Sequence, residues 1–217
     1  AVKLGTATAI EALKRAGVTA DQVDHVVYGG VITTGANAAY LGRHIGLYAG
    51  VPQEVPALTV NRLCGSGMQS VISAAQMIQL GEGDVVLAGG AENMSQAPYS
   101  NFEQRFNGTK MGDLQFTDML QATLTDQYTG SGMGLTAEKL AEQYDISREE
   151  QDAFAVLSHD RATKAREQGK FAQEIVPVVL QTRKGDVKVE TDEHIKEGTS
   201  VETLAKLRPA FKKDGTV

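Results

Sequence analysis

Short apolar runs alternate with amphipathic helical patterns along the first part of the chain, and this alternation constrains the fold more than any other feature. Residues 23–32 contain the apolar triplet Val26-Val27-Tyr28, residues 57–60 form a second run, and residues 84–90 read Asp-Val-Val-Leu-Ala-Gly-Gly. Runs of this length bounded by glycine or proline are typical of strands, and the last reads as a strand buried on both faces. Strands that alternate with helices indicate an α/β layered domain.

Three helical patterns lie between these strands. The first covers residues 3–16 and ends before Gly17, and the second is expected to begin after an Asn37 cap and to run to Tyr48. The third is predicted from Met68 to Leu80 and has both an apolar face and small residues, which suit a helix buried on most sides. The apolar face consists of Met68, Val71, Ile72, Ala75 and Ile78, and the small residues are Ser70, Ser73 and Ala74.

The character of the sequence changes after residue 92. Residues 93–127 are polar and weakly periodic, and an unstructured loop of this length is unusual in a compact domain, so we expect an ordered excursion used for contacts. Helices resume over residues 136–144 and after Ser147, which forms a capping-box pattern with Glu150.

A hairpin is expected near the end of the chain, because residues 175–180 and 187–190 flank a Thr-Arg-Lys-Gly-Asp turn. We therefore predict a core domain over residues 1–92 and an inserted α+β region over residues 93–217. The chain begins inside a helical pattern and ends on Asp-Gly-Thr-Val, a turn into a strand, so both ends are expected to continue in a longer protein.

Composition excludes several classes of function. The net charge of −6 argues against a broad nucleic-acid surface, and no apolar run approaches the roughly 18 residues of a membrane span. The chain has a single cysteine, which cannot form an intrachain disulfide or complete a cysteine-rich zinc site, so we expect no metal and a reducing, cytoplasmic location.

That cysteine, Cys64, lies in the stretch Asn-Arg-Leu-Cys-Gly-Ser-Gly between a predicted strand and a predicted helix. The thiolate is the nucleophilic form of cysteine, and a helix N-terminus favours negative charge. Gly65 and Gly67 keep side chains away, so that an acyl group could approach and backbone N–H groups could face a developing oxyanion. This arrangement suits acyl transfer through a thioester.

Two other interpretations of the stretch stay open at this point. A lone cysteine at a strand–helix junction is more often a small apolar filler, and spacing alone favours that alternative. A Gly-x-Gly turn after a strand could also bind phosphate, but the last glycine of the dinucleotide fingerprint is missing here.

The stretch around Cys64 nevertheless resembles the signature region of the thiolases, and further thiolase motifs follow it in the family's order over nearly the whole chain. Within the family, residues 93–99 and 132–138 are more similar to acetyl-CoA acetyltransferases than to long-chain enzymes. The motifs are Gly-Glu-Gly-Asp at 81–84, Ala-Gly-Gly-Ala-Glu-Asn-Met-Ser at 88–95, Thr-Ala-Glu at 136–138, Ser-Arg-Glu-Glu-Gln-Asp-Ala-Phe-Ala at 147–155, Glu-Ile-Val-Pro at 174–177 and Lys-Leu-Arg-Pro-Ala-Phe at 206–211.

The resemblance implies a thiolase-like layered α/β fold, with helices packed on a mixed β-sheet. Residues 1–92 would be the N-terminal half-domain without its first strand, and residues 93–217 the inserted loop domain; the C-terminal half-domain would be absent. Residues 102–118 (a loop of about 101–120) correspond to the segment through which family members associate into tetramers, as dimers of dimers. Its apolar contacts would be Phe102, Phe106, Met111 and Phe116, which could instead simply pack inward.

By the same resemblance Cys64 takes an acyl group from acyl-CoA, and its own N–H contributes to an oxyanion hole. Met133 would shape a short acyl pocket, and Gly132 stands where some members carry a CoA-contacting histidine. Leu124, Lys196 and Thr203 fall where the inserted region touches CoA, although a lysine among acidic neighbours is more often a solvated surface charge. No cofactor is implied beyond the CoA thioester substrates.

A thiolase also needs an activating histidine, a second cysteine and a water-positioning asparagine, which the family carries in its C-terminal half. The four histidines of this chain match none of the family's active-site motifs and are expected to be structural or exposed; they are His25, His44, His159 and His194.

Three hypotheses follow. The leading one is part of an acetyl-CoA acetyltransferase of lipid metabolism, which condenses two acetyl-CoA to acetoacetyl-CoA by a ping-pong mechanism through acyl-Cys64 and is inactive as residues 1–217 alone. The second is a 3-ketoacyl-CoA thiolase of fatty-acid β-oxidation. The third, from another class, is a non-catalytic assembly or CoA-binding module.

Overall fold

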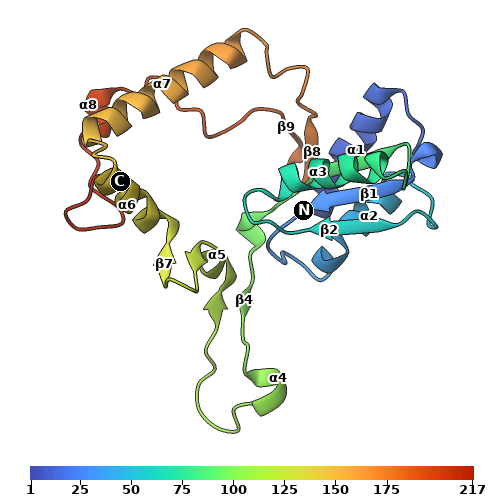
Figure 1. Cartoon of the computed structure of the whole chain (residues 1–217), viewed down its shortest axis with the longest axis horizontal. Helices are drawn as coiled ribbons and strands as arrows, with labels where there is room; N and C mark the ends of the chain where they lie inside the picture. The colour runs from blue at the N-terminus through green and yellow to red at the C-terminus, as the bar shows by residue number, and fades with distance from the viewer. The chain divides into compact units, whose positions relative to one another are not determined.

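The structure, a computed structural model, describes residues 1–217 except for the side chain of Asn107 (Figure 1). By its internal contacts the chain divides into two compact units, Ala1–Thr123 and Leu124–Val217. The units divide later than the boundary expected at residue 92, so the polar segment 93–123 groups with the first unit by its contacts. The expected division into a half-domain and an inserted loop domain stays a prediction.

The first unit contains a parallel sheet in the order β2-β1-β3. Strand β1 (His25–Gly29) is central, with Val26 opposite Ala57 of β2 (Ala57–Val60) and opposite Leu87 of β3 (Val86–Gly90). Each strand is followed by a helix or a long connection, as parallel pairing requires. The predicted α/β layering is confirmed.

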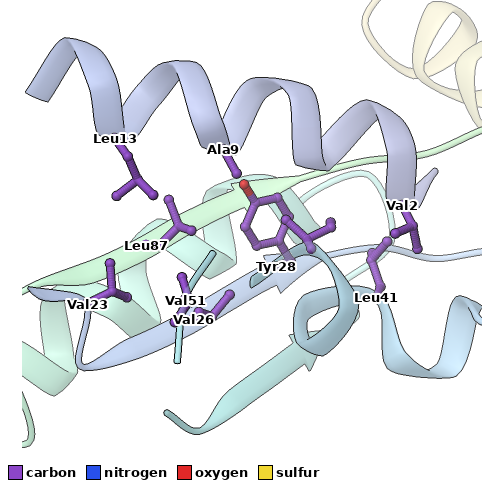
Figure 2. Packing of buried hydrophobic residues seen from close by; sticks show 10 residues of the cluster. Val2, Ala9, Leu13, Val23, Val26, Tyr28, Leu41, Val51 and Leu87 are labelled. Atoms are coloured by element: carbon purple, nitrogen blue, oxygen red, sulfur yellow. The ribbon is translucent and has the colours of Figure 1, made fainter. Parts of the chain in front are cut away.

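Helices α1 (Val2–Ala16) and α2 (Leu41–Tyr48) pack on one face of this sheet. Side chains alternate along β1, so Val26 and Tyr28 enter the core with α1 and α2. Figure 2 shows Tyr28 and Leu87 between their strands and α1. Members of this core are almost fully shielded from solvent: Val2, Ala9, Leu13, Val23, Val26, Tyr28, Leu41, Ile45, Val51 and Leu87.

The start of the second helical pattern differs from the prediction. Asn37 makes no side-chain cap hydrogen bond, and a 3-10 turn, η2 (Ala38–Tyr40), precedes α2. Asparagine at this position therefore contributes a turn rather than a helix cap.

Helix α3 (Ser66–Gln79) packs against β1 and β3. It buries its small residues Ser66, Ser70 and Ala74, whereas Met68 stays 67% exposed and Val71 53% exposed. Burial on most sides, expected from the sequence, does not occur within the described residues: the small face meets the sheet and the apolar face meets solvent.

The polar segment after β3 is ordered, as expected. Strands β4 (Tyr99–Ser100) and β5 (Thr117–Asp118) pair antiparallel, and the Asn101 side chain bonds to the backbone of Glu103, Gln104 and Gln115. The remaining short elements of the first unit are η1 (Ala20–Gln22), η3 (Met94–Gln96), α4 (Gln104–Asn107) and α5 (Met119–Thr123).

The second unit consists mainly of helices and short hairpins. Ser147 caps α7 through the predicted capping box with Glu150, and the predicted hairpin forms with Arg183-Lys184 at its turn. Its elements are β6 (Thr125–Asp126), β7 (Ser131–Gly132), α6 (Met133–Gln143), α7 (Arg148–Glu167), β8 (Val178–Thr182), β9 (Gly185–Val189) and α8 (Val201–Leu204).

The last residues of the second unit are held by a buried carboxylate. Glu138 of α6 accepts hydrogen bonds from the N–H groups of Thr216 (3.0 Å) and Val217 (2.9 Å), and these bonds hold its pKa below the usual value.

Among the described helices, none is long and apolar enough to cross a membrane.

Candidate active site

Cys64 lies on the turn between β2 and α3, at the carboxyl edge of the parallel sheet. Its side chain is exposed. The alternative that this cysteine is a buried apolar filler is therefore wrong for the described structure. An exposed thiol two residues before a helix begins is instead available to a reacting group.

The turn is held by side-chain hydrogen bonds on both sides of Cys64. Asn61 Oδ1 accepts from the N–H of Leu63 at 3.0 Å. Ser66 is buried, with 4% of the residue exposed; its hydroxyl accepts from the N–H of Arg62 at 2.9 Å and donates to the carbonyl of Leu63 at 2.6 Å. These bonds fix the backbone of Arg62 and Leu63, directly before Cys64.

Leu63, directly before Cys64, adopts a φ of 48°. This left-handed conformation is unfavourable for a residue with a Cβ, and in observed structures it concentrates at functional sites. The surrounding hydrogen bonds therefore stabilise a backbone conformation that the leucine itself disfavours.

Two glycines bring α3 close to the sheet. A Cβ at Gly29 would lie 2.5 Å from the Ser66 carbonyl, and a Cβ at Gly90 would lie 3.3 Å from the Cα of Gly67. Because neither strand carries a side chain there, the first turn of α3 can rest on the backbone of β1 and β3. This contact determines where Cys64 lies relative to the sheet.

Backbone N–H groups around Cys64 divide into paired and unpaired sets. Those of Gly65 and Ser66 donate to the carbonyls of Arg62 and Leu63. Within the described residues, the N–H groups of Cys64 and Gly67 have no such acceptor. Unpaired donors at a helix N-terminus are suited to an oxyanion.

Neither histidine of the first unit lies at this turn. His25 begins β1, at the opposite edge of the sheet, and His44 stacks on Tyr40 with ring centroids 5.2 Å apart. In the second unit His159 Nδ1 accepts from the N–H of Lys196 at 3.3 Å, which is a structural contact.

The structure brings together two of the predicted substrate-binding residues. Leu124 and Met133 flank the β6–β7 pair, and the Met133 N–H donates to the Leu124 carbonyl at 3.3 Å. Both side chains are exposed, Met133 at 53% and Leu124 at 43%. They belong to the second compact unit, whereas Cys64 belongs to the first.

Lys196 and Thr203 lie in and after an exposed loop of the second unit. The Lys196 ammonium contacts the Glu193 carbonyl at 3.5 Å, and the Lys196 carbonyl accepts from the Thr199 hydroxyl at 2.7 Å. Thr203 is paired with Ser200, the cap of α8. Neither side chain is bonded to Leu124 or Met133.

Strands β4 and β5 are joined by residues 101–116, a segment that we call the β4–β5 excursion. Its apolar residues are exposed: Phe102, Phe106, Met111 and Phe116 are 73%, 96%, 92% and 58% accessible. The alternative that they pack inward is therefore wrong within the described structure. Among the residues that the structure describes, no group of three histidine, cysteine or acidic side chains could hold a metal ion.

Fold and site together define an α/β protein that presents a thiol on a strand–helix turn at the carboxyl edge of a parallel sheet. The family model "Thiolase, N-terminal domain" matches residues 1–217. The chain therefore belongs to the thiolase family, as the sequence motifs indicated.

The names of individual relatives differ. The chain is 50% identical to the beta-ketothiolase BktB of Cupriavidus necator, over 99% of this chain and 55% of the relative. It is 46% identical to human mitochondrial 3-ketoacyl-CoA thiolase (100% and 55%) and 45% identical to the acetyl-CoA acetyltransferase of Rhizobium meliloti (99% and 54%). The chain thus spans about half the length of the relatives it matches.

Solved structures agree on the fold. The acetyl-CoA acetyltransferase of Bacillus anthracis superposes with a TM-score of 0.94 at 42% identity, over 100% of this chain and 54% of that one. Human mitochondrial 3-ketoacyl-CoA thiolase in complex with CoA gives a TM-score of 0.93 at 43% identity, with the same coverage.

Several residues that shape the site were not assigned a role from the sequence. Ser66, Gly29 and Glu92 lie next to the turn or behind it, and their roles depend on contacts between distant segments. The available signal was positional: Gly29 lies at the end of β1 and Glu92 lies two residues beyond β3, and the carboxyl ends of these two strands share one edge of the sheet.

Proposed function

We propose that this chain supplies the acyl-accepting part of a thiolase active site, in an acetyl-CoA acetyltransferase that condenses two acetyl-CoA to acetoacetyl-CoA and CoA and catalyses the reverse thiolysis. The observation that carries this proposal is the exposed Cys64 thiol on the turn between β2 and α3. Membership of the thiolase family supports it.

The proposed reaction has two halves. The Cys64 thiolate attacks the carbonyl carbon of acetyl-CoA, the C–S bond to CoA breaks, and CoA leaves as a thiolate that takes up a proton. A second acetyl-CoA then loses an α-proton, and its carbanion attacks the acetyl-Cys64 carbonyl. The new C–C bond forms as the C–S bond to Cys64 breaks, so the thiolate is regenerated.

The tetrahedral intermediates of both halves carry a negative oxygen. We assign the N–H of Cys64 as a donor to that oxygen, because this N–H has no acceptor among the described residues. Gly65 and Gly67 leave this approach clear of side chains.

We assign the acyl and CoA contacts to the second unit. Met133 is proposed to shape the acyl pocket, and Leu124 is proposed to touch CoA. The hydrogen bond between their backbones keeps the two residues adjacent, and their exposed side chains are available for such contacts. Lys196 and Thr203 are proposed to meet CoA, with the lysine ammonium near a phosphate. CoA in a solved thiolase with a TM-score of 0.93 to this chain supports CoA as the partner.

Proton transfer needs groups beyond those of this chain. Cys64 is the single cysteine in 217 residues, and His25 and His44 lie away from its turn. We therefore propose that the activating histidine and the second cysteine come from sequence outside residues 1–217, and that these residues alone do not turn over.

Assembly and compartment are part of the same proposal. The exposed residues Phe102, Phe106, Met111 and Phe116 support association of like chains through the β4–β5 excursion, as a dimer of dimers. A cytoplasmic location follows from the lone cysteine, and the mitochondrial names of some relatives provide the alternative.

Acetyl labelling tests the nucleophile directly. The protein, in the longest form in which it is expressed, is mixed with acetyl-CoA, quenched with acid and digested, and the Cys64 peptide is weighed by mass spectrometry. We expect an acetyl group on Cys64 and none in a Cys64→Ala control. An unmodified Cys64 peptide at early and late quench times contradicts the proposal, and CoA binding without labelling would support a non-catalytic module.

A second candidate function is a 3-ketoacyl-CoA thiolase acting on longer chains. The specific observation in its favour is that human mitochondrial 3-ketoacyl-CoA thiolase and the Rhizobium acetyl-CoA acetyltransferase are 46% and 45% identical to this chain. The ratio of kcat/KM for acetoacetyl-CoA to that for 3-ketooctanoyl-CoA decides between them, because a closed acyl pocket discriminates against the longer chain.

A further inference from the structure

A chain of hydrogen bonds runs from the end of β3 to the residue before Cys64. Glu92, two residues beyond β3, accepts at Oε2 from the N–H groups of Val31 (2.9 Å) and Ile32 (3.2 Å). The Val31 carbonyl in turn accepts from Asn61 Nδ2 at 3.5 Å, the longest and weakest link. Asn61 Oδ1 then accepts from the Leu63 N–H at 3.0 Å.

The loop that carries Val31 and Ile32 is not held by packing alone. A cavity of about 290 Å3 lies beside it, lined in part by Val31, Ile32, Thr33 and Asn61. Loops without dense packing depend on their polar contacts for a fixed position. The Glu92 carboxylate supplies those contacts here, and it is half-buried, so water competes less for its oxygens.

Asn61 acts on the turn where the backbone is least favourable. Leu63 has a φ of 48°, a conformation that leucine disfavours, and the Asn61 side chain bonds to the N–H of that same residue. Without that acceptor the peptide before Cys64 is free to rotate toward ordinary conformations. Such a rotation changes the direction of the Cys64 side chain and of its N–H together.

We infer that Asn61 is a positioning residue that orients the Cys64 thiol toward the acyl carbonyl. Glu92 contributes to this role because it holds the loop at Val31, to which Asn61 is bonded. This inference rests on the proposed function, because it concerns the acylation of Cys64. Neither residue needs to touch the substrate: Asn61 acts through Leu63, and Glu92 acts through the loop at Val31. The expected loss is therefore in the rate of acyl transfer rather than in the binding of acyl-CoA.

The test compares a directional reaction with a non-directional one. The longest expressed form of the protein is used for single-turnover acetylation of Cys64 by acetyl-CoA and for alkylation of Cys64 by iodoacetamide. Acyl transfer requires the thiolate and the oxyanion donor to be aligned, whereas a small alkylating reagent can approach an exposed thiol from many directions.

In Asn61→Ala we expect the acetylation rate constant to fall at least tenfold, with the dissociation constant for acetyl-CoA and the alkylation rate each within threefold of wild type. Asn61→Asp keeps the acceptor for Leu63 but loses the donor to the Val31 carbonyl, so its acetylation rate should lie between those of Asn61→Ala and wild type. The acetylation rate constant should fall further in Glu92→Ala than in Glu92→Gln, because glutamine keeps an acceptor oxygen. Asn37→Ala, an exposed asparagine without a cap hydrogen bond, is the matched control and should react as wild type.

A further variant addresses the backbone itself. Glycine adopts positive φ without penalty, so Leu63→Gly introduced into Asn61→Ala should recover part of the lost acetylation rate. Thermal unfolding of each variant shows whether a lost rate reflects a lost fold, and variants whose unfolding temperature stays near wild type are compared.

The outcomes separate the two proposals. If wild-type Cys64 is alkylated but never acetylated, the proposed function is wrong, and the positioning role is wrong with it. If wild type is acetylated and Asn61→Ala is acetylated equally fast, the positioning role alone is wrong. Equal losses in acetylation and alkylation also overturn it, because they would show an effect on thiol reactivity rather than on direction.

Discussion

Gly29 of β1 and Ser66 of α3 lie so close that a Cβ on the glycine would be 2.5 Å from the serine carbonyl carbon and oxygen. No ordinary Cβ contact is that short, so any side chain at position 29 must move the first turn of α3. Cys64 lies two residues before that turn. The absence of a side chain on β1 is therefore part of what places the thiol.

Replacing this glycine tests that contact. We expect Gly29→Ala to destabilise the fold by about 1–3 kcal/mol, because the atoms it meets are backbone and cannot change rotamer. Urea unfolding measures the loss. Gly67→Ala is the control, since a Cβ there has nothing within 4 Å, and its stability should be unchanged or higher. Equal stabilities for the two variants would contradict the argument.

On the other face of the sheet, the stability effects of replacing Gly89 and Tyr28 are expected to depend on each other. Tyr28 is 2% exposed, burial raises its pKa to about 12, and a Cβ at Gly89 would lie 2.7 Å from its ring. Gly89→Ala should cost about 1–3 kcal/mol in wild type but clearly less in a Tyr28→Ala background, where the ring is absent. A double-mutant cycle with no coupling energy would show that the ring does not meet this position.

The capping box of α7 gives a prediction for the second unit. Ser147→Ala removes the acceptor for the Glu150 N–H at 3.1 Å and should lower the free energy of unfolding by about 0.5–2 kcal/mol. Ser200→Ala is matched to it, because Ser200 caps the four-residue α8 whereas Ser147 caps the 20-residue α7. Circular dichroism at 222 nm during urea unfolding compares the two, and a larger effect at Ser200 would be evidence against the cap of α7 as a stabilising element.

Glu138 predicts an acid-sensitive attachment of the last residues. Its pKa lies below the usual value because its carboxylate accepts from the N–H groups of Thr216 and Val217. A lowered folded-state pKa means that the ionised group stabilises the fold fully above the ordinary glutamate pKa of about 4.3, and that this stabilisation is lost as pH falls through the lowered value.

The melting temperature of Glu138→Gln should therefore lie below wild type near pH 7 and approach it as the solution is acidified below about pH 4. Hydrogen exchange at Thr216 and Val217 should rise in the variant. Glu142→Gln, an exposed neighbour 3.7 Å from Lys212, is the control and should follow wild type across the range. A constant gap between Glu138→Gln and wild type at every pH would contradict the assignment.

The β4–β5 excursion predicts a change in assembly. If like chains associate through it, Phe106→Ser combined with Met111→Ser should shift the protein to a smaller species in analytical ultracentrifugation, because these side chains are 96% and 92% exposed in the single chain. Tyr128→Ser, at 97% exposure outside the excursion, should leave the assembly unchanged. An unchanged sedimentation coefficient in the double variant would remove this segment from the interface.

Local signals in the sequence predicted the three strands of the parallel sheet, the helices α1, α2 and α3 around it, and α6, α7 and the β8–β9 hairpin of the second unit, but none of the short elements. Strand β2 was predicted at its observed bounds, and Ser147 with Glu150 predicted the cap of α7, because these patterns depend on neighbours within a few residues. The prediction that Asn37 caps α2 was wrong, because a 3-10 turn lies between Asn37 and the start of α2. Helix α3 was predicted as a helix, yet its buried face was not, because burial depends on what lies opposite.

For this protein, then, the order of strands and helices, the family motifs and the identity of Cys64 as the single thiol were determined by the sequence alone. Tertiary structure decided the rest: that Cys64 is exposed, that Leu63 before it has a positive φ, and that Glu92 and Asn61 join one network across 31 positions of the chain by way of Val31. The physical reason is that hydrogen bonds and close approaches between distant segments arise only when parallel strands bring their carboxyl ends to one edge. No pattern of neighbouring residues records them.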